Sequence, residues 1–310
     1  MTVSVSPPDT AIGRSVPELW KTRRDKIRFQ WSSVLLLSPA LGLLVILFLI
    51  PIGYAFYLGF TNLTLVGPTA VRWGWTGTQN LTRLASDTTF TSSLWVTLFF
   101  VVGSIIGVVA MGYWLSSLLL RAQAWVRVLV GGIVVIAWMM PAISAGMTWY
   151  ASTTASGAFG TLTGHPQADF LANQPLLIVT LANVWSQTGF AMLVIGAALR
   201  NIPSEILEAA SVENASSWQR FRMVVLPLLR PTFTAVVLIV ALLSLANFSL
   251  IYVMTQGGPG NATDILPLYS YQQAFQFNNL AYGALIGNVM VIIASIFGVL
   301  YVRVASRGAS

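Results

Sequence analysis

The sequence has 310 residues, of which 56% are apolar and only 8% are charged. A water-soluble domain carries about 25% charged residues, so this composition excludes an ordinary soluble domain and indicates an integral membrane protein. Without cysteine there is no disulfide, thiolate metal site or cysteine nucleophile, and the +7 charge resides in residues that flank apolar runs rather than in a nucleic-acid-binding stripe.

Residues 1–32 are polar and proline-containing at first and then strongly basic. Apolar residues among these cations favour a short interfacial helix on the cytoplasmic surface, and a disordered basic tail is the alternative for about the first 15 residues. The apolar run that follows, at 34–60, is longer than the roughly 7–15 residues of a signal-peptide core. We therefore expect a retained first span. The basic residues of this segment are Arg14, Lys21, Arg23, Arg24, Lys26 and Arg28.

Five further apolar runs follow the first span, and each is long enough for the ~20 helical residues that cross a membrane. They lie at about 92–120, 128–150, 175–199, 231–255 and 281–302. Pro141 lacks a backbone N–H and predicts a kink in the third span. Gly103 and Gly107 predict close helix packing in the second. The predicted fold is an all-α membrane protein with six transmembrane helices in a domain at 33–303, followed by a cytoplasmic tail at 304–310.

Basic residues predict the orientation of the chain, because cytoplasmic loops of membrane proteins are rich in lysine and arginine. With the N-terminus inside, all 16 lysines and arginines except Arg72 and Arg83 fall in cytoplasmic segments. We therefore expect both termini in the cytoplasm. The loop between the fourth and fifth spans is then cytoplasmic as well.

That loop contains the densest run of charged residues between two apolar segments. Its pattern predicts two short helices joined by a turn. Ser204 is a candidate N-cap for the first helix, and Asn214 tolerates the left-handed backbone that ends a helix. Ser216 and Gln219 have the capping-box spacing that starts a second helix, which Pro227 is expected to end.

The loop resembles the signature of the membrane-spanning permease subunits of binding-protein-dependent ABC importers, in their carbohydrate branch. That signature is Glu-Ala-Ala, three residues, Gly-Ala, then Phe and Leu-Pro. Asn214 replaces the usual Gly and Glu213 the usual Asp, which keeps the turn and the charge but predicts a stiffer turn. A charged loop that only stays hydrated is the alternative. The matching positions are Glu208, Ala209, Ala210, Glu213, Asn214, Ala215, Phe221 and Pro227.

The resemblance extends over most of residues 33–303 and leaves the basic N-terminal segment outside. The outer stretch at 255–264, followed by 269–275, looks like that of the first permease of maltose/glycerol-phosphate-type systems. The family implies a second homologous permease, two cytoplasmic ATPase subunits that hold ATP and magnesium, and an extracytoplasmic substrate-binding protein. It also implies the plasma (inner) membrane of a prokaryote, and it makes the loop a coupling helix for the ATPases.

The chain itself lacks the residues for ATP hydrolysis. A phosphate-binding loop needs a glycine-rich turn before Lys and Ser or Thr, whereas Lys21 and Lys26 have no adjacent glycine. His165 is the only histidine, so no histidine cluster can hold a metal. The predicted spans contain no Asp, Glu, Lys, Arg or His, which argues against a proton-coupled carrier and favours an uncharged cargo. We expect no enzyme activity, catalytic residue, bound cofactor or metal.

Uncharged polar and aromatic residues at mid-span depth suit a sugar, which is bound by amide hydrogen bonds and ring stacking. Helix-to-helix hydrogen bonds, worth about 0.6–2 kcal/mol each, are the alternative role for these amides. The resemblance implies that the fifth and sixth spans hold the cargo, which ranks Asn247 and Asn288 first. The candidate pathway residues are Ser244, Asn247, Phe248, Tyr252 and Asn288, with Asn183, Trp185 and Gln187 on the fourth span.

Taken together, the sequence predicts the translocation-pathway subunit of an ATP-driven importer for a sugar or similar neutral polyol. One alternative is a permease for glycerol phosphate or another small solute, which for a phosphate would need a cationic group near the pathway. Another is a stand-alone secondary carrier or channel. An operon that encodes a binding protein and a second permease would separate the importer from the stand-alone carrier.

Overall fold

The computed structural model describes residues 31–307, and its regular structure within that range is helical. Thr61 and Trp75 form an isolated bridge there, without extending into a strand. This confirms the predicted all-α class. The basic residues that precede Trp31, and the interfacial helix predicted among them, lie outside the described residues.

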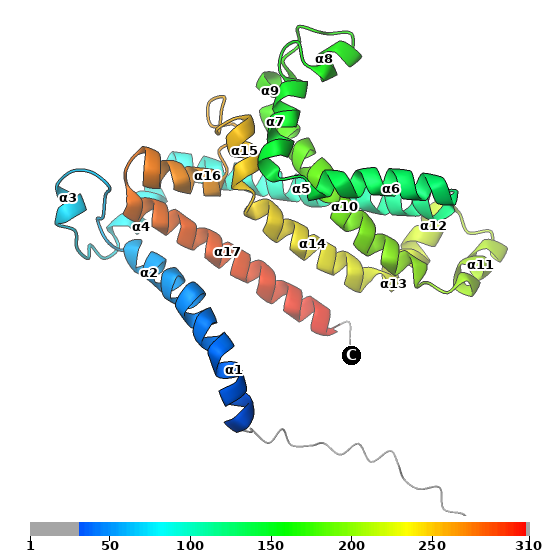
Figure 1. Cartoon of the computed structure of the whole chain (residues 1–310), viewed down its shortest axis with the longest axis horizontal. Helices are drawn as coiled ribbons and strands as arrows, with labels where there is room; N and C mark the ends of the chain where they lie inside the picture. Colours follow the sequence, from blue (N-terminus) through cyan, green and yellow to red (C-terminus); the bar gives the residue numbers. More distant parts are fainter. Residues whose placement is uncertain (1–30, 308–310) are drawn as a thin grey trace, which may run out of the picture. The chain divides into compact units, whose positions relative to one another are not determined.

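The chain divides into two compact units, residues 1–51 and 52–310. The described part of the first unit holds α1 (Trp31–Leu44), the π-helical turn η1 (Val45–Leu49) and the start of α2 (Ile50–Leu58). The second unit holds the remaining helices, which Figure 1 labels in chain order.

Four helical stretches within residues 31–307 are long and apolar enough to cross a membrane. Two bent helix pairs raise that number to six if each pair is one crossing, in agreement with the six predicted spans. The four are Leu36–Leu58, Thr88–Arg121, Pro175–Arg200 and Leu280–Arg303, and the bent pairs are Ala124–Met139 with Ala142–Thr153 and Ser217–Leu228 with Arg230–Leu245.

The third predicted span is a sharply bent pair and not one helix. α6 (Ala124–Met139) ends before Pro141, and α7 (Ala142–Thr153) leaves it at 106°. Pro141 is the residue before α7 and has no N–H to continue the α6 hydrogen-bond ladder. The proline therefore produces a corner where the sequence predicted a kink.

The fifth predicted span, 231–255, is also discontinuous. α14 (Arg230–Leu245) ends, and α15 (Phe248–Met254) begins after two linking residues. Asn247 has φ −81° and ψ 70°, outside the helical region. Asn247 therefore lies in a break between helices and not in the middle of one, which corrects the expectation of a single continuous span.

The second unit is built around α5 (Thr88–Arg121) and α10 (Pro175–Arg200), which pack along each other, with α6 and α14 against them (Figure 1). A Cβ atom added at Gly112 would lie 2.6 Å from the Cβ of Ala191, and one at Gly107 would clash with Val184. The glycines thus allow the two backbones to approach closely, as predicted for Gly103 and Gly107.

Asp87 ties the start of α5 to the C-terminal helices. One carboxylate oxygen accepts hydrogen bonds from the N–H groups of Thr89 and Phe90, at 2.9 and 3.1 Å, and so caps α5. The other accepts from the Tyr269 hydroxyl at 2.6 Å and from the Tyr282 hydroxyl. Burial acts to raise the pKa of Asp87, but these hydrogen bonds outweigh it and hold the pKa below its ordinary value.

Several short helices and the long last helix complete the second unit. α17, the last helix, continues past the predicted span end at 302. The bounds are α3 (Pro68–Val71), α4 (Gln79–Ser86), α8 (Ala158–Leu162), α9 (Phe170–Asn173), α16 (Leu266–Tyr271), the π-helical turn η3 (Gln272–Gln276) and α17 (Leu280–Arg307).

Candidate functional site

The loop after α10 folds as the two short helical segments that its sequence predicts. α11 (Ser204–Val212) is followed by a turn and by α12 (Ser217–Arg220), which continues through the π-helical turn η2 (Phe221–Val225) into α13 (Leu226–Leu228). Figure 1 shows α11 standing at the edge of the second unit.

Two of the predicted local capping features are present in this loop, and the third is absent. Asn214 adopts φ 55°, and the N–H of Ala215 donates to the carbonyl of Ala210 at 3.1 Å, which closes the C-terminus of α11. Ser216 and Gln219 exchange the two hydrogen bonds of a capping box. Ser204, in contrast, is the first helical residue, and its side chain caps nothing because the helix already begins after Pro203.

The second limb of the loop is anchored by one aromatic residue. The Phe221 ring lies 4.8 Å from the ring of Tyr113 on α5, and Val225 is buried nearby in the same apolar cluster. Pro227 does not end the limb, since α13 runs one residue farther to Leu228, and α14 then turns away by 78°. Phe221 therefore fixes the loop to the helix bundle.

The face of α11 is open to solvent. Glu208, Ala209 and Glu213 are exposed, and Val212 is an apolar side chain at 80% exposure. An exposed apolar residue close to exposed carboxylates on a short helix is suited to contact a partner. The prediction that this loop is a coupling surface remains a prediction, with its residues now placed on an accessible helix.

A buried polar network joins α5, α10 and the α14–α15 break. Asn183 is fully buried, and its amide nitrogen donates to the hydroxyls of Ser104 at 2.7 Å and Ser244 at 2.9 Å. Its carbonyl oxygen accepts from the amide nitrogens of Gln187 and Asn247, both at 2.8 Å. Every hydrogen-bonding group of the Asn183 side chain is thus satisfied, by residues on α5, on α14, on α10 itself and in the break.

Aromatic side chains gather next to this network. Phe248 stacks on Tyr252 with ring centroids 5.1 Å apart, and Tyr271 lies 5.0 Å from Phe248 and 5.4 Å from Phe275. Phe248, Tyr271 and Phe275 line a cavity of about 430 Å³, together with Asn288 and Ser270. Among residues 31–307, no Asp, Glu, Lys, Arg or His side chain lines this cavity.

The predicted pathway residues therefore fall into two groups. Phe248 and Asn288 share the cavity, and the Asn288 amide also donates to the carbonyl of Ala55 at 3.2 Å. Ser244 and Asn247 belong to the Asn183 network, where Ser244 is fully buried. Tyr252 does not line the cavity, but its ring contacts Phe248 and Tyr271, which do.

Tyr271 and Phe275 were not among the candidate pathway residues. They follow the outer loop on α16 and η3, which the hydropathy pattern does not identify as a span. The signal that could have indicated them is their three- to four-residue spacing from a second aromatic residue. Only the structure places them against Phe248, which lies more than twenty residues earlier in the chain.

Comparison with known proteins gives the family. The family model described as "Binding-protein-dependent transport system inner membrane component" matches residues 103–309. The trehalose transport system permease protein SugA of Mycobacterium tuberculosis is 30% identical, over 88% of this chain and 90% of SugA. The trehalose/maltose transport system permease protein MalF of Thermococcus litoralis is 27% identical, over 91% and 96% of the two chains.

A solved structure has the same fold. It belongs to a bacterial ABC transporter that imports the acidic polysaccharide alginate, and the match has a TM-score of 0.73 at 19% identity, over 89% of this chain and 96% of that chain. At this identity the likeness speaks for the fold alone. Because the family model covers most of the chain, including the predicted coupling loop, this protein belongs to the family of inner membrane components of binding-protein-dependent transport systems.

Proposed function

We propose that this chain is the permease subunit that forms part of the translocation pathway in an ATP-driven importer for an uncharged sugar or polyol. The observation that carries the proposal is the uncharged cavity lined by Phe248, Tyr271 and Asn288, within a chain of this transport family. Rings and amides without ionised groups suit a ligand that is rich in hydroxyls and carries no charge. Relatives named for trehalose and maltose transport support the same class of cargo.

The energy for transport would come from partners. The family depends on a binding protein, and we assign to the complex a second permease and two ATPase subunits, which would hold ATP and magnesium. The exposed α11 helix offers the ATPases a surface at the end of the unit away from α8 and α15 (Figure 1). The distribution of basic residues supports a cytoplasmic position for this end and for both termini.

Glycerol phosphate is the weaker cargo candidate. A phosphate group in a permease is expected to meet arginine or lysine, because charge-assisted hydrogen bonds recognise phosphate oxygens best. The cavity beside Phe248 has no such residue in its lining. No observation on the described residues favours a stand-alone carrier over a subunit of an importer.

The test is uptake by the complex reconstituted in proteoliposomes with its partner subunits and binding protein. We expect ATP-dependent uptake of a neutral disaccharide or oligosaccharide and none of glycerol phosphate. Phe248→Leu keeps the side-chain volume but removes the ring face, and should lower sugar uptake about two- to tenfold while basal ATPase activity stays unchanged.

Phe99→Leu is the matched control, since Phe99 is an exposed ring on α5 that does not line the cavity. Uptake equal to wild type in both variants would remove the cavity from the pathway. Uptake of glycerol phosphate in preference to every neutral sugar would overturn the proposed cargo class.

A further inference from the structure

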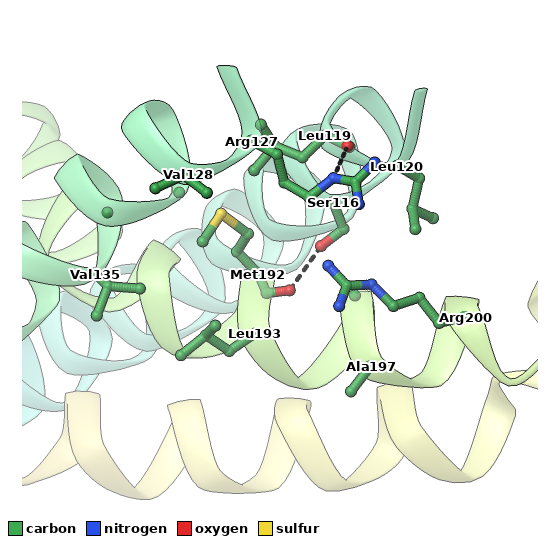
Figure 2. A pocket seen from close by; sticks show the side chains of 13 residues that line it. Ser116, Leu119, Leu120, Arg127, Val128, Val135, Met192, Leu193, Ala197 and Arg200 are labelled. Carbon is green, nitrogen blue, oxygen red and sulfur yellow. Dashed lines mark hydrogen bonds between the residues drawn. The ribbon is translucent and has the colours of Figure 1, made fainter. Parts of the chain in front are cut away.

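A second cavity lies away from the proposed pathway, between α5, α6 and α10 at the end where α11 begins. Its volume is about 480 Å³, and its walls are largely apolar, with side chains such as Leu119, Val128 and Leu193 (Figure 2). Val128 is 75% exposed, so the cavity opens as a groove on the surface of the helix bundle. In a membrane this surface faces lipid or another transmembrane helix.

Two arginines stand at one end of the groove. Arg127 donates to the carbonyls of Leu119 at 3.1 Å and Ala122 at 3.2 Å, which holds its guanidinium over the last turn of α5. Arg200, on the last turn of α10, turns back over the groove (Figure 2). The Arg200 side chain forms no hydrogen bond or ion pair to any residue in 31–307, and no acidic side chain among those residues lines the groove.

The depth of the groove matches the membrane surface. Arg121 and Arg200 end the two long apolar helices, and exposed Trp125 begins α6 at the same end. Tryptophan and arginine at helix ends mark the headgroup level of a bilayer, with acyl chains beside the apolar residues one or two turns deeper. The groove thus runs from headgroup level into the hydrocarbon region.

We propose that this groove is a binding site for an anionic phospholipid, with the phosphate between Arg127 and Arg200 and an acyl chain along the apolar walls. Two arginines without an acidic counterpart complement a phosphate, and a neutral transmembrane helix would leave the Arg200 guanidinium without a partner. Glycines provide the space for the chain, since a Cβ atom added at Gly132 would meet nothing within 4 Å. This site is separate from the proposed cargo cavity and does not depend on which solute is transported.

The experiment is native mass spectrometry of the complete detergent-purified complex after delipidation and addition of an equimolar mixture of phosphatidylglycerol and phosphatidylcholine with identical chains. We expect wild type to retain phosphatidylglycerol preferentially. Arg200→Gln should lower that preference about fivefold. Gly132→Leu should lower the total retained lipid because its side chain fills the groove.

Arg121→Gln is the matched control. Arg121 ends α5 at the same end of the helix bundle, so this change removes the same charge there, but Arg121 does not line the groove. Equal losses in Arg121→Gln and Arg200→Gln would show a general effect of surface charge and overturn the site. Equal retention of the two lipids by wild type would overturn it too, as expected if a helix of a second permease or a second copy of this chain occupies the groove.

Discussion

At the scale of single residues, Asn183 determines which hydrogen bonds the Asn247 side chain can still form. The amide nitrogen of Asn247 donates a hydrogen bond to the side-chain carbonyl oxygen of Asn183, at 2.8 Å. This bond uses one of the two hydrogens of that amide, so the second N–H and the carbonyl oxygen of Asn247 are left for other contacts, and we expect Asn247 to meet a sugar hydroxyl as a donor or as an acceptor. The position of the α14–α15 break thus sets the chemistry that Asn247 offers to the pathway.

Asn183→Ala should destabilise the protein more than Asn288→Ala. The first change removes four hydrogen bonds and leaves the buried Ser104 hydroxyl without its Asn183 partner, while Gln187 and Ser244 keep the 3.1 Å bond between them; each group that stays buried and unpaired costs about 1–3 kcal/mol. The second removes one bond of 3.2 Å, worth about 1 kcal/mol. Thermal unfolding of both variants in the same detergent checks the order, and an equal fall in Tm would contradict it.

Asp264 predicts a pH dependence of stability. It lies in the loop before α16, where burial raises its pKa to about 7. A weak hydrogen bond from Ser93 lowers the pKa, but by less than burial raises it. The folded state therefore holds a proton that the unfolded state, with the ordinary pKa of 3.8, releases. The contribution of Asp264 to the free energy of unfolding should therefore be highest below pH 4. It should fall between about pH 4 and 7, by at most about 1.4 kcal/mol per pH unit.

Asp264→Asn tests this pH dependence, because the amide cannot lose a proton. The variant should show a smaller fall in Tm than wild type between about pH 4 and 7. Asp169→Asn is the control, since Asp169 caps the short helix α9 from an exposed loop. Parallel pH profiles for wild type and Asp264→Asn would show that Asp264 stays ionised in the folded protein.

The sequence predicted local backbone signals better than side-chain partners. Asn214 and the Ser216–Gln219 capping box depend on residues within five positions, and both formed as expected. The partners of Asn183 on other elements, Ser104, Ser244 and Asn247, lie 61 to 79 residues away from it in the sequence, so the rotation and depth of each helix decide the contacts. Hydropathy gives a span its length but leaves that rotation open.

At the scale of elements, two of the six predicted spans proved to be broken. Pro141 supplied a signal for the first break, although the 106° angle depends on the packing of α7 against α15. The second break has no proline or glycine. This break places the Asn247 side chain against Asn183 on α10, 64 residues away in the sequence, a contact that the local sequence pattern does not predict.

The exposed face of α11 should transmit the action of the ATPases. Val212→Asp places a charge on an apolar side chain that contacts little of its own chain, so the variant should fold while the substrate-stimulated ATPase activity of the assembled complex falls at least tenfold. Leu162→Asp is the control, because Leu162 is 86% exposed on α8 at the other end of the unit. Full coupling in Val212→Asp would support a loop that merely stays hydrated.

At the scale of the whole molecule, the proposed orientation places α11 and α8 on opposite sides of the membrane. The number of crossings could be predicted because apolar length is a strong signal. The assembly could not be predicted, because α1, η1 and α2 present apolar residues such as Leu36, Phe48 and Ile50 that are exposed in the single chain. A single sequence does not say whether lipid or another subunit covers them.

Labelling of introduced cysteines measures this orientation, because the chain has none of its own. Ser216 and Ala155 are both exposed, in the coupling loop and before α8. A membrane-impermeant thiol reagent applied to intact cells should label Ala155→Cys and leave Ser216→Cys unlabelled until the membrane is opened. The reverse pattern would invert the proposed topology.

The close contact of α5 with α10 limits how such a transporter can move. Where Gly107 and Gly112 admit Val184 and Ala191, the two helices cannot slide or part without opening voids in a packed interior. They must travel together as one rigid block through a transport cycle. A change between two conformations would then take place at hinges, at the Pro141 corner and at the break before Phe248. No continuous helix resists bending at these two positions.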